Sequence, residues 1–316
     1  MKILVLGAAG YLGSRICQNL SKKGYQIIAC VRSKNTINEE WLNLMYKIIV
    51  GDIRRPDTIQ AVLDSNVDII INLISLNDKL SKSNPILVSS INVMPTWDLL
   101  FRLSKTNLKK FIYFSTIHVY GKNKNIPLCE TENVKPQNMY GLTHLLAENI
   151  CNFFKNRTEI DCINIRLSNS YGPPIIDNIN CWNLVLNDLC RSAYFENRIN
   201  IKSDGKALRD FIHGDDVVAA LEKIILFNER CENTYNLCSG FSNSILDLAF
   251  LVKNIFSIKY KKNINIYCLN EQITKKNNQK RKESLYSNQR IRDLGFREKI
   301  SLSDGISGVF DYFDQK

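Results

Sequence analysis

The sequence predicts an α/β fold: a doubly wound parallel sheet of the Rossmann type, followed by a smaller mixed C-terminal domain. In the first half of the chain, short β-rich runs alternate with helical stretches, which is typical of βαβ units. The expected strands are apolar along their whole length, as strands are when helices cover both faces of a sheet. A glycine-rich turn, Gly7 to Gly13, directly follows the first strand and precedes the first helix.

The expected elements of the sheet are short apolar runs and the helical stretches that separate them. The strands are predicted at residues 2–6, 26–31, 47–50, 67–73, 110–115 and 162–166. The helices between them are predicted at residues 13–23, 56–64, 87–105 and 139–155.

Beyond Arg166 this alternation loosens. A Gly-Pro-Pro turn at 172–174 introduces a helix, and two strands and a further helix follow it. The predicted bounds are a helix at 181–195, a strand at 198–202, a helix at 215–227 and a strand at 234–238. We therefore expect a first domain over residues 1–170 and a second over 171–316, with segments of the second returning to the first sheet.

Composition excludes several classes of protein. The chain has 316 residues, of which 45% are hydrophobic and 23% charged, as in an ordinary globular protein. No apolar run approaches the roughly 20 residues of a membrane span, and the first one, residues 3–6, is too short for a signal peptide. The ten cysteines contain no C-x-x-C pair, so we expect reduced thiols in a cytoplasmic protein. The three histidines are far apart in sequence, and no metal site is expected.

The chain is basic, with 42 lysines and arginines against 31 acidic residues and a net charge of +11. This excess suits nucleic acid, an anionic membrane or small phosphorylated molecules, or it is simply a solvated surface. Much of it lies in one tract, residues 275–282, where no aromatic residues alternate with the lysines as base stacking would require. We expect a small phosphorylated partner, with neither nucleic acid nor membrane.

The turn after the first strand reads G-x-x-G-x-x-G. Glycines at this spacing allow a tight turn and a close approach of the backbone to a pyrophosphate, and the helix N-terminus then offers N–H donors to the phosphates. The pattern predicts a dinucleotide site that consists of Gly7, Gly10, Tyr11, Leu12 and Gly13.

The end of the second strand indicates which dinucleotide. NAD-selective proteins place a carboxylate there, but this chain has Arg32, with Ser33 as a second donor. Arg32 is either a ligand of a 2′-phosphate or a solvent-facing residue of a turn; the first interpretation favours NADP(H) over NAD(H). After the third strand, Asp52 and Ile53 are expected near the adenine.

Five motifs occur in an order that resembles the extended short-chain dehydrogenase/reductase family, in particular its nucleotide-sugar epimerases, dehydratases and reductases. The likeness covers almost the whole chain. The residues that carry it are Ile91-Asn92-Val93, Phe111 to Thr116 with Val119-Tyr120-Gly121, Tyr140-Gly141-Leu142-Thr143-His144, Arg166 to Pro173, and Arg209-Asp210-Phe211-Ile212-His213.

The resemblance implies roles for single residues. Thr116 matches the catalytic Ser/Thr, and Tyr140 and His144 fall on the tyrosine and lysine of the Y-x-x-x-K motif. Asn92 matches a helix asparagine at the cofactor. The residues that would bind the sugar nucleotide are Thr116, Asn169, Arg209 and Arg281. The resemblance also implies a homodimer through a four-helix bundle, with the helices at 87–105 and 139–155 as the contacts.

The chain departs from the family at two places. Ile71 to Ser75 stands where relatives often have H-L-A-A, and His144 replaces the lysine. Residues four apart on a helix share a face, so His144 is expected beside Tyr140. A neutral imidazole can hydrogen-bond a ribose, but with an ordinary pKa of about 6.5 it holds no permanent charge beside the phenol.

The missing charge leaves Tyr140 protonated more of the time. That harms ketone reduction, which needs an acid, less than alcohol oxidation, which needs a base. Together with Arg32, this favours an NADP(H)-dependent oxidoreductase acting at C4 of a nucleotide-linked keto sugar. Two alternatives stay open: a nucleotide-sugar 4-epimerase with tightly bound NAD, and a catalytically silent nucleotide-binding protein. A 4,6-dehydratase is not expected, because Ile117 and His118 stand where dehydratases carry an acidic pair.

Overall fold

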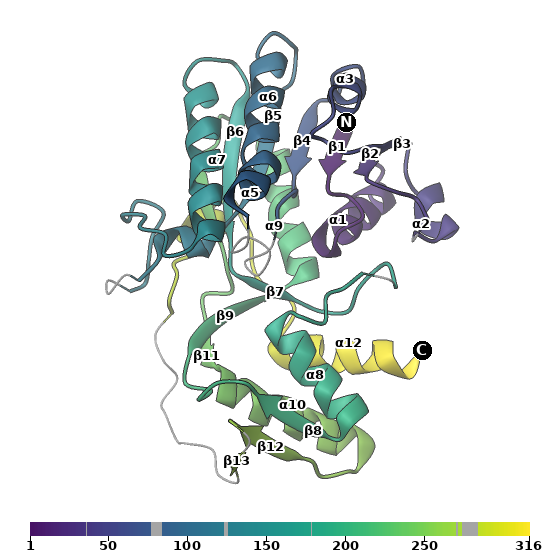
Figure 1. The fold of residues 1–316 in the computed structure, drawn as a ribbon, viewed down its shortest axis with the longest axis vertical. Coiled ribbons are helices and arrows are strands. Elements are labelled where there is room, and N and C mark those ends of the chain that lie inside the picture. Colours follow the sequence, from purple (N-terminus) through teal and green to yellow (C-terminus); the bar gives the residue numbers. More distant parts are fainter. Residues whose placement is uncertain (36, 77–83, 123–125, 178, 270, 274–283) are drawn as a thin grey trace.

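A computed structural model describes the whole chain except residues 36, 77–83, 123–125, 178, 270 and 274–283. Its upper part in Figure 1 is a seven-stranded sheet in which all neighbouring strands are parallel, in the order β10-β6-β5-β4-β1-β2-β3. The strands are β1 (Lys2–Leu6), β2 (Gln26–Val31), β3 (Lys47–Val50), β4 (Ile69–Asn72), β5 (Lys110–Thr116), β6 (Asp161–Leu167) and β10 (Thr234–Leu237). The predicted fold class is confirmed.

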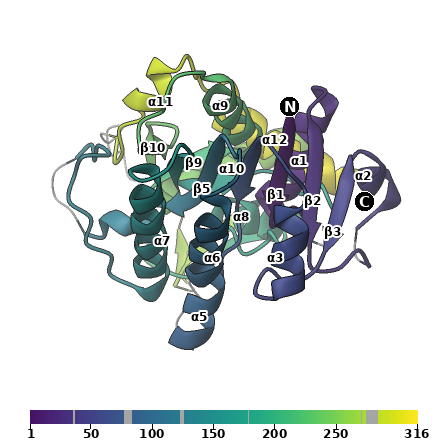
Figure 2. The same ribbon diagram turned by 90° about the horizontal axis from the view of Figure 1, so that it is seen from above.

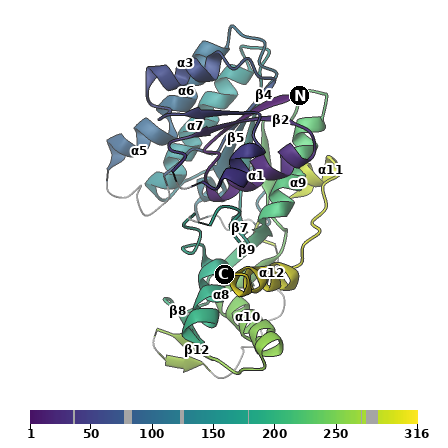
Figure 3. The same cartoon turned by 90° about the vertical axis from the view of Figure 1, so that its right-hand side faces the viewer.

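Helices cover both faces of this sheet (Figures 2 and 3). One face carries α3 (Pro56–Leu63), α5 (Pro85–Asn92), α6 (Met94–Leu103) and α7 (Met139–Lys155), and the other carries α1 (Tyr11–Lys22), α9 (Gly214–Leu226) and α11 (Gln289–Asp293). Side chains of one strand alternate between the two cores: Ile3 and Val5 pack on the α1 side, whereas Leu4 and Leu6 pack on the α7 side. Strands buried on both faces explain the continuous apolar runs in the sequence. The short α2 (Glu39–Asn43) adds Trp41 to the α1 side.

A smaller mixed layer lies below the large sheet in Figure 1. It contains two three-stranded sheets, each with one parallel and one antiparallel pairing. Their strands are β7 (Asn169–Tyr171), β9 (Leu208–His213) and β11 (Ser242–Ser244), and β8 (Arg198–Ile201), β12 (Asn265–Cys268) and β13 (Glu271–Ile273). The helices α8 (Val185–Glu196), α10 (Ile245–Tyr260) and α12 (Leu302–Asp314) pack around a third core.

The chain passes between the two layers several times. β6 continues almost directly into β7, and β9 leads into α9, which packs on α1 of the first layer. β10 then pairs with β6 at the edge of the large sheet. Residues beyond 171 therefore contribute the strand β10 and the helices α9 and α11 to the first layer.

Two predicted helices differ from those observed. The stretch 87–105 is two helices, α5 and α6, which meet at Val93, because Pro95 lacks an N–H and its ring would clash with the carbonyl one turn earlier. The helix expected at 181 begins at Val185, since Cys181 belongs to a turn in which its carbonyl accepts from Leu184.

Apolar side chains remain exposed on the α5–α7 face. They are Met94, Trp97 and Phe101 on α6, and Leu142, Leu146 and Phe153 on α7. The homodimer through a four-helix bundle stays a prediction, since the structure describes a single chain. None of the described helices has the length and apolar character that a bilayer crossing would require.

A buried ion pair holds α7 on the sheet. Arg166 of β6 donates from Nη2 and Nε to the carboxylate of Glu148 on α7, at 2.8 and 3.1 Å, and both side chains are at most 7% exposed. Ser115 of β5 donates to the same carboxylate. Arg166 also lies over the ring of Tyr120, at 4.8 Å, and donates to the carbonyl of Glu130. One carboxylate thus joins one helix to two neighbouring strands.

Glu148→Ala should lower the free energy of unfolding by about 3–5 kcal/mol, because it leaves the Arg166 charge buried without its carboxylate. Urea denaturation measures the change. Asp98→Ala, which removes an exposed partner of Arg102 one turn away on α6, is the control and should cost less than about 1 kcal/mol. Equal losses in the two variants would show that the buried pair contributes no more than an exposed one.

Candidate active site

The carboxyl ends of the parallel strands face the smaller layer, because β6 enters that layer through β7 and its neighbours run in the same direction (Figure 1). Ligands of open parallel sheets bind at this edge. The predicted site residues that the structure describes all follow the strands of this edge or belong to the elements that pack against it.

The glycine turn after β1 has the geometry that a pyrophosphate requires. Gly7 adopts a φ of +78°, and its carbonyl accepts from Gly10 N at 3.0 Å. A Cβ on Gly13 would lie 2.2 Å from that carbonyl oxygen, so only glycine allows α1 to pack this close to β1. α1 begins at Tyr11 without a side-chain cap, which leaves the first N–H groups, including those of Tyr11 and Leu12, for a ligand. These residues fit a dinucleotide.

At the end of β2, the sequence predicted Arg32 without a neighbouring carboxylate, and the structure differs. Arg32 and Ser33 are exposed. Asp52, which follows the neighbouring strand β3, binds Arg54 through contacts of 2.5 to 3.1 Å. The hydrogen bonds and charge of Arg54, aided by the charge of Arg32, lower the pKa of Asp52 to about 2. A carboxylate therefore stands close to Arg32 after all, supplied by the adjacent strand.

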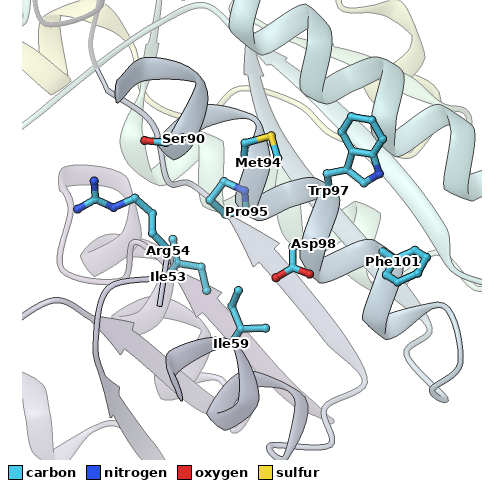
Figure 4. Close-up of a pocket in the computed structure, with 9 residues that line it drawn as sticks. All are labelled: Ile53, Arg54, Ile59, Ser90, Met94, Pro95, Trp97, Asp98 and Phe101. Atoms are coloured by element: carbon cyan, nitrogen blue, oxygen red, sulfur yellow. The ribbon is translucent and has the colours of Figure 1, made fainter. Parts of the chain in front are cut away.

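Ile53 lines a cavity of about 530 Å³ between α3 and α6 (Figure 4). Ile53 and Ile59 lie on one side of it, and Pro95 and Asp98 of α6 lie on the other. The remaining lining residues are Arg54, Ser90, Met94, Trp97 and Phe101. The sequence placed Ile53 at the adenine end of the site, but gave no signal that α6 would form the opposite wall.

Thr116, Tyr140 and His144 lie where β5 ends and α7 begins. Thr116 is buried, and its Oγ1 accepts from His118 N at 3.3 Å. The ring of His118 contacts that of Tyr140 edge-on, with 5.8 Å between centroids. Tyr140 in turn packs edge-on against His144 at 4.5 Å, which places these two residues on one face of α7. The structure brings the three predicted catalytic residues into one neighbourhood.

His144 is almost fully buried and makes one hydrogen bond that the sequence did not indicate. Its Nδ1 lies 2.8 Å from Oη of Tyr113 on β5. Its Nε2 is buried and has no hydrogen-bond partner within the described part of the chain. Burial, with a smaller contribution from His118, lowers the pKa of His144 to about 3, so the imidazole is neutral at physiological pH. An orphaned buried nitrogen beside Tyr140 suits a ligand hydroxyl.

Asn92 holds protein segments together. Its Nδ2 donates to Oγ1 of Thr143 at 3.0 Å, and its Oδ1 accepts from Leu76 N at 2.8 Å. It therefore connects α5, α7 and the segment after β4. Asn72, the last residue of β4, acts similarly: its amide donates to Oγ1 of Thr96 on α6 at 3.0 Å. A contact of Asn92 with a cofactor stays a prediction.

Two of the predicted substrate residues, Asn169 and Arg209, lie in the smaller layer. Asn169 donates to the carbonyl of Asp210 at 2.8 Å, and the neighbouring Arg209 is exposed. The Asp210 carboxylate is fully buried and accepts from Ser168 at 2.7 Å and from the backbone N–H groups of the 239–241 turn. Asp210 is thus structural, whereas the guanidinium of Arg209 is exposed and donates to the carbonyl of Leu208 at 2.8 Å. Arg281 lies outside the described residues.

Comparisons with known proteins find relatives that match most of the chain. The family model described as NAD dependent epimerase/dehydratase family matches residues 3–238. A putative UDP-glucose 4-epimerase of Methanocaldococcus jannaschii is 25% identical over 313 residues, covering 98% of this chain and 97% of that protein.

Two solved structures share the fold over 100% of this chain and 99% of theirs. The UDP-glucose 4-epimerase of Thermotoga maritima with UDP-glucose superposes with a TM-score of 0.84 at 24% identity. The UDP-glucuronic acid 4-epimerase of Bacillus cereus, in complex with UDP-glucuronic acid and NAD, superposes with a TM-score of 0.81 at 23% identity.

Gly13→Ala should lower the free energy of unfolding by about 1–3 kcal/mol and weaken dinucleotide binding, because the added methyl group pushes α1 away from Gly7. Denaturation and calorimetric titration with NAD and NADP measure the two effects. Gly308→Ala on α12, where an added Cβ meets nothing within 4 Å, is the matched control and should keep or raise stability. Unchanged dinucleotide binding in Gly13→Ala would argue against this turn as the pyrophosphate site.

Proposed function

The chain belongs to the NAD-dependent epimerase/dehydratase family, and from that premise we propose that it is a nucleotide-sugar 4-epimerase that uses NAD. The observation that carries the proposal is the likeness to a putative UDP-glucose 4-epimerase over 98% of the chain. The grouping of Thr116, Tyr140 and His144 at the sheet edge supports an active enzyme over a silent nucleotide-binding protein.

The relatives favour this alternative over the main interpretation of the sequence, an NADP(H)-dependent reductase. Epimerases are among the most similar proteins, and solved structures of this fold contain NAD. The structure also weakens the argument from Arg32. Arg32 is exposed, and its charge helps to lower the pKa of Asp52, so the two side chains are close. An exposed arginine beside a carboxylate disfavours a dedicated pocket for a 2′-phosphate.

In the proposed site, the turn from Gly7 to Gly13 binds the pyrophosphate, Asp52 and Ile53 lie at the adenine end, and His144 binds the ribose at the other end. NAD, when bound, would supply reversible hydride transfer at C4 of the sugar. Tyr140 takes the proton from the 4-hydroxyl and returns it to the same oxygen, acting as base and then as acid. Thr116 hydrogen-bonds that oxygen, and Asn169 and Arg209 hold the diphosphate of the substrate.

The proposal predicts that the purified chain interconverts UDP-glucose and its C4 epimer without net consumption of NAD. Tyr140→Phe should lower the rate about 100- to 10,000-fold, since general acid–base catalysis contributes that much, while NAD affinity stays nearly unchanged. Chromatography of the nucleotide sugars measures turnover. Tyr46→Phe, which alters an exposed tyrosine beside β3, should keep full activity.

Two results would contradict the epimerase assignment. NADPH oxidation by a keto sugar without epimerisation would restore the reductase. A protein that binds NAD but turns over neither UDP-glucose nor UDP-glucuronic acid would not be an epimerase of these sugars. A loss below tenfold in Tyr140→Phe would reject the role of this tyrosine.

The cofactor proposal predicts that NAD binds at least as tightly as NADP. Arg32→Asp should weaken NADP binding by about two- to tenfold, because an exposed, screened charge contributes little, and should leave NAD binding almost unchanged. Fluorescence titration measures both affinities. Arg191→Asp on α8 makes the same charge change in the other layer and should alter neither. Tighter binding of NADP by the unaltered chain would overturn the choice of NAD.

A further inference from the structure

A tyrosine outside the proposed catalytic set forms a buried hydrogen bond with His144. Tyr113 lies on β5, its side chain is completely buried, and its Oη is 2.8 Å from His144 Nδ1. The two rings are tilted by 40°, with 5.7 Å between centroids. The proposed reaction gives Tyr113 no role, yet it contacts the residue that replaces a lysine.

The direction of this hydrogen bond follows from what surrounds Tyr113. Within the described residues, its hydroxyl makes no other hydrogen bond. If it accepted from an Nδ1–H, two buried groups would lack a partner, its own proton and the lone pair of Nε2, whereas donation to Nδ1 leaves only the Nε2–H without one. Glu148 lies one turn further along α7, but its oxygens accept from Ser115 and Arg166. Tyr113 therefore donates to Nδ1.

Donation to Nδ1 determines where the imidazole carries its proton. A neutral imidazole has one N–H, and burial keeps His144 neutral because it lowers the pKa of this ring. With Nδ1 acting as acceptor, the proton is on Nε2. The two ring nitrogens point in diverging directions, so this N–H is on the side of the ring away from Tyr113. It is buried and has no partner among the described residues.

We propose that Tyr113 is a positioning residue: its hydroxyl holds His144 in the Nε2–H tautomer, so that this N–H donates to a ribose hydroxyl of the bound dinucleotide. A lysine has three donors on a flexible stem and needs no such partner. An imidazole has one directed donor, and the wrong tautomer would offer the ribose no N–H at all. The inference rests on the proposed NAD site, but the tautomer itself can be measured without NAD.

Long-range proton–nitrogen NMR correlation on chain labelled with 15N-histidine tests the tautomer. The chain has only three histidines, so the signals of His118, His144 and His213 can be assigned by substitution. At neutral pH, unaltered protein should show His144 protonated at Nε2 alone. Tyr113→Phe should convert this pattern to a mixture of tautomers, with the other two histidines unchanged. An Nδ1–H tautomer in unaltered protein would overturn the proposal, even if the variant did not fold.

Tyr120→Phe is the matched control. Tyr120 is as buried as Tyr113, but its hydroxyl donates to Asn236 at 2.7 Å instead of to His144. A general effect of deleting a buried hydroxyl would appear in both variants, whereas only Tyr113→Phe should change the His144 signals. The same change in both variants, or in neither, would overturn the positioning role.

NAD titrations connect the tautomer to the site. Tyr113→Phe should weaken NAD binding about two- to tenfold, the equivalent of one hydrogen bond, and His144→Ala should weaken it at least as much. In the His144→Ala background, Tyr113→Phe should add no further loss; a full additional loss would overturn the proposal. Unaltered protein that binds no NAD, yet loses its Nε2–H tautomer in Tyr113→Phe, would refute the proposed function and still support Tyr113 as the residue that sets the tautomer.

Discussion

The buried pair of Glu148 and Arg166 is the constraint on which the proposed active site depends. Glu148 follows His144 by one helical turn and Tyr140 by two, so the three residues share one face of α7. Its carboxylate is held by Arg166 from β6 and by Ser115 from β5. The pair thus ties α7 to β5 and β6 on the same helix face that carries Tyr140 and His144, and breaking it leaves a buried charge unpaired. Tyr140 and His144 then face the edge where β5 ends.

At that edge the chain has a buried, neutral imidazole at the position that the family resemblance assigns to a lysine. A lysine buried as deeply as His144 would need a compensating partner, since a buried charge is costly. The imidazole avoids this cost by staying neutral, but it must be oriented, and Tyr113 supplies a partner for Nδ1. An epimerase needs Tyr140 as both acid and base. His144 itself brings no fixed positive charge to Tyr140, which affects the rate of the proposed base step without excluding that step or the acid step.

The cofactor and substrate parts of the proposed site belong to different layers that the chain crosses repeatedly. The glycine turn and Asp52 follow strands of the large sheet, whereas Asn169 and Arg209 lie on β7 and β9. The buried carboxylate of Asp210 holds the 239–241 turn beside them. Because β6 continues into β7 with a single residue between them, the two sets of residues cannot move far apart.

Features that depend on neighbours along the chain could be predicted from the sequence: the order of strands and helices, the glycine turn, and the common face of Tyr140 and His144. Backbone sterics and the helical repeat act over only a few residues. Local signals also led to one wrong prediction: the single helix expected at 87–105 is divided at Val93, because Pro95 interrupts it. Which distant residues meet depends on how the strands pair and how the helices pack. Asp52 stands near Arg32 because β3 pairs with β2, and Tyr113 reaches His144 across 31 residues because α7 packs on β5. Such contacts arise from strand pairing and helix packing, which bring together side chains whose separation in sequence carries no information about their distance in space.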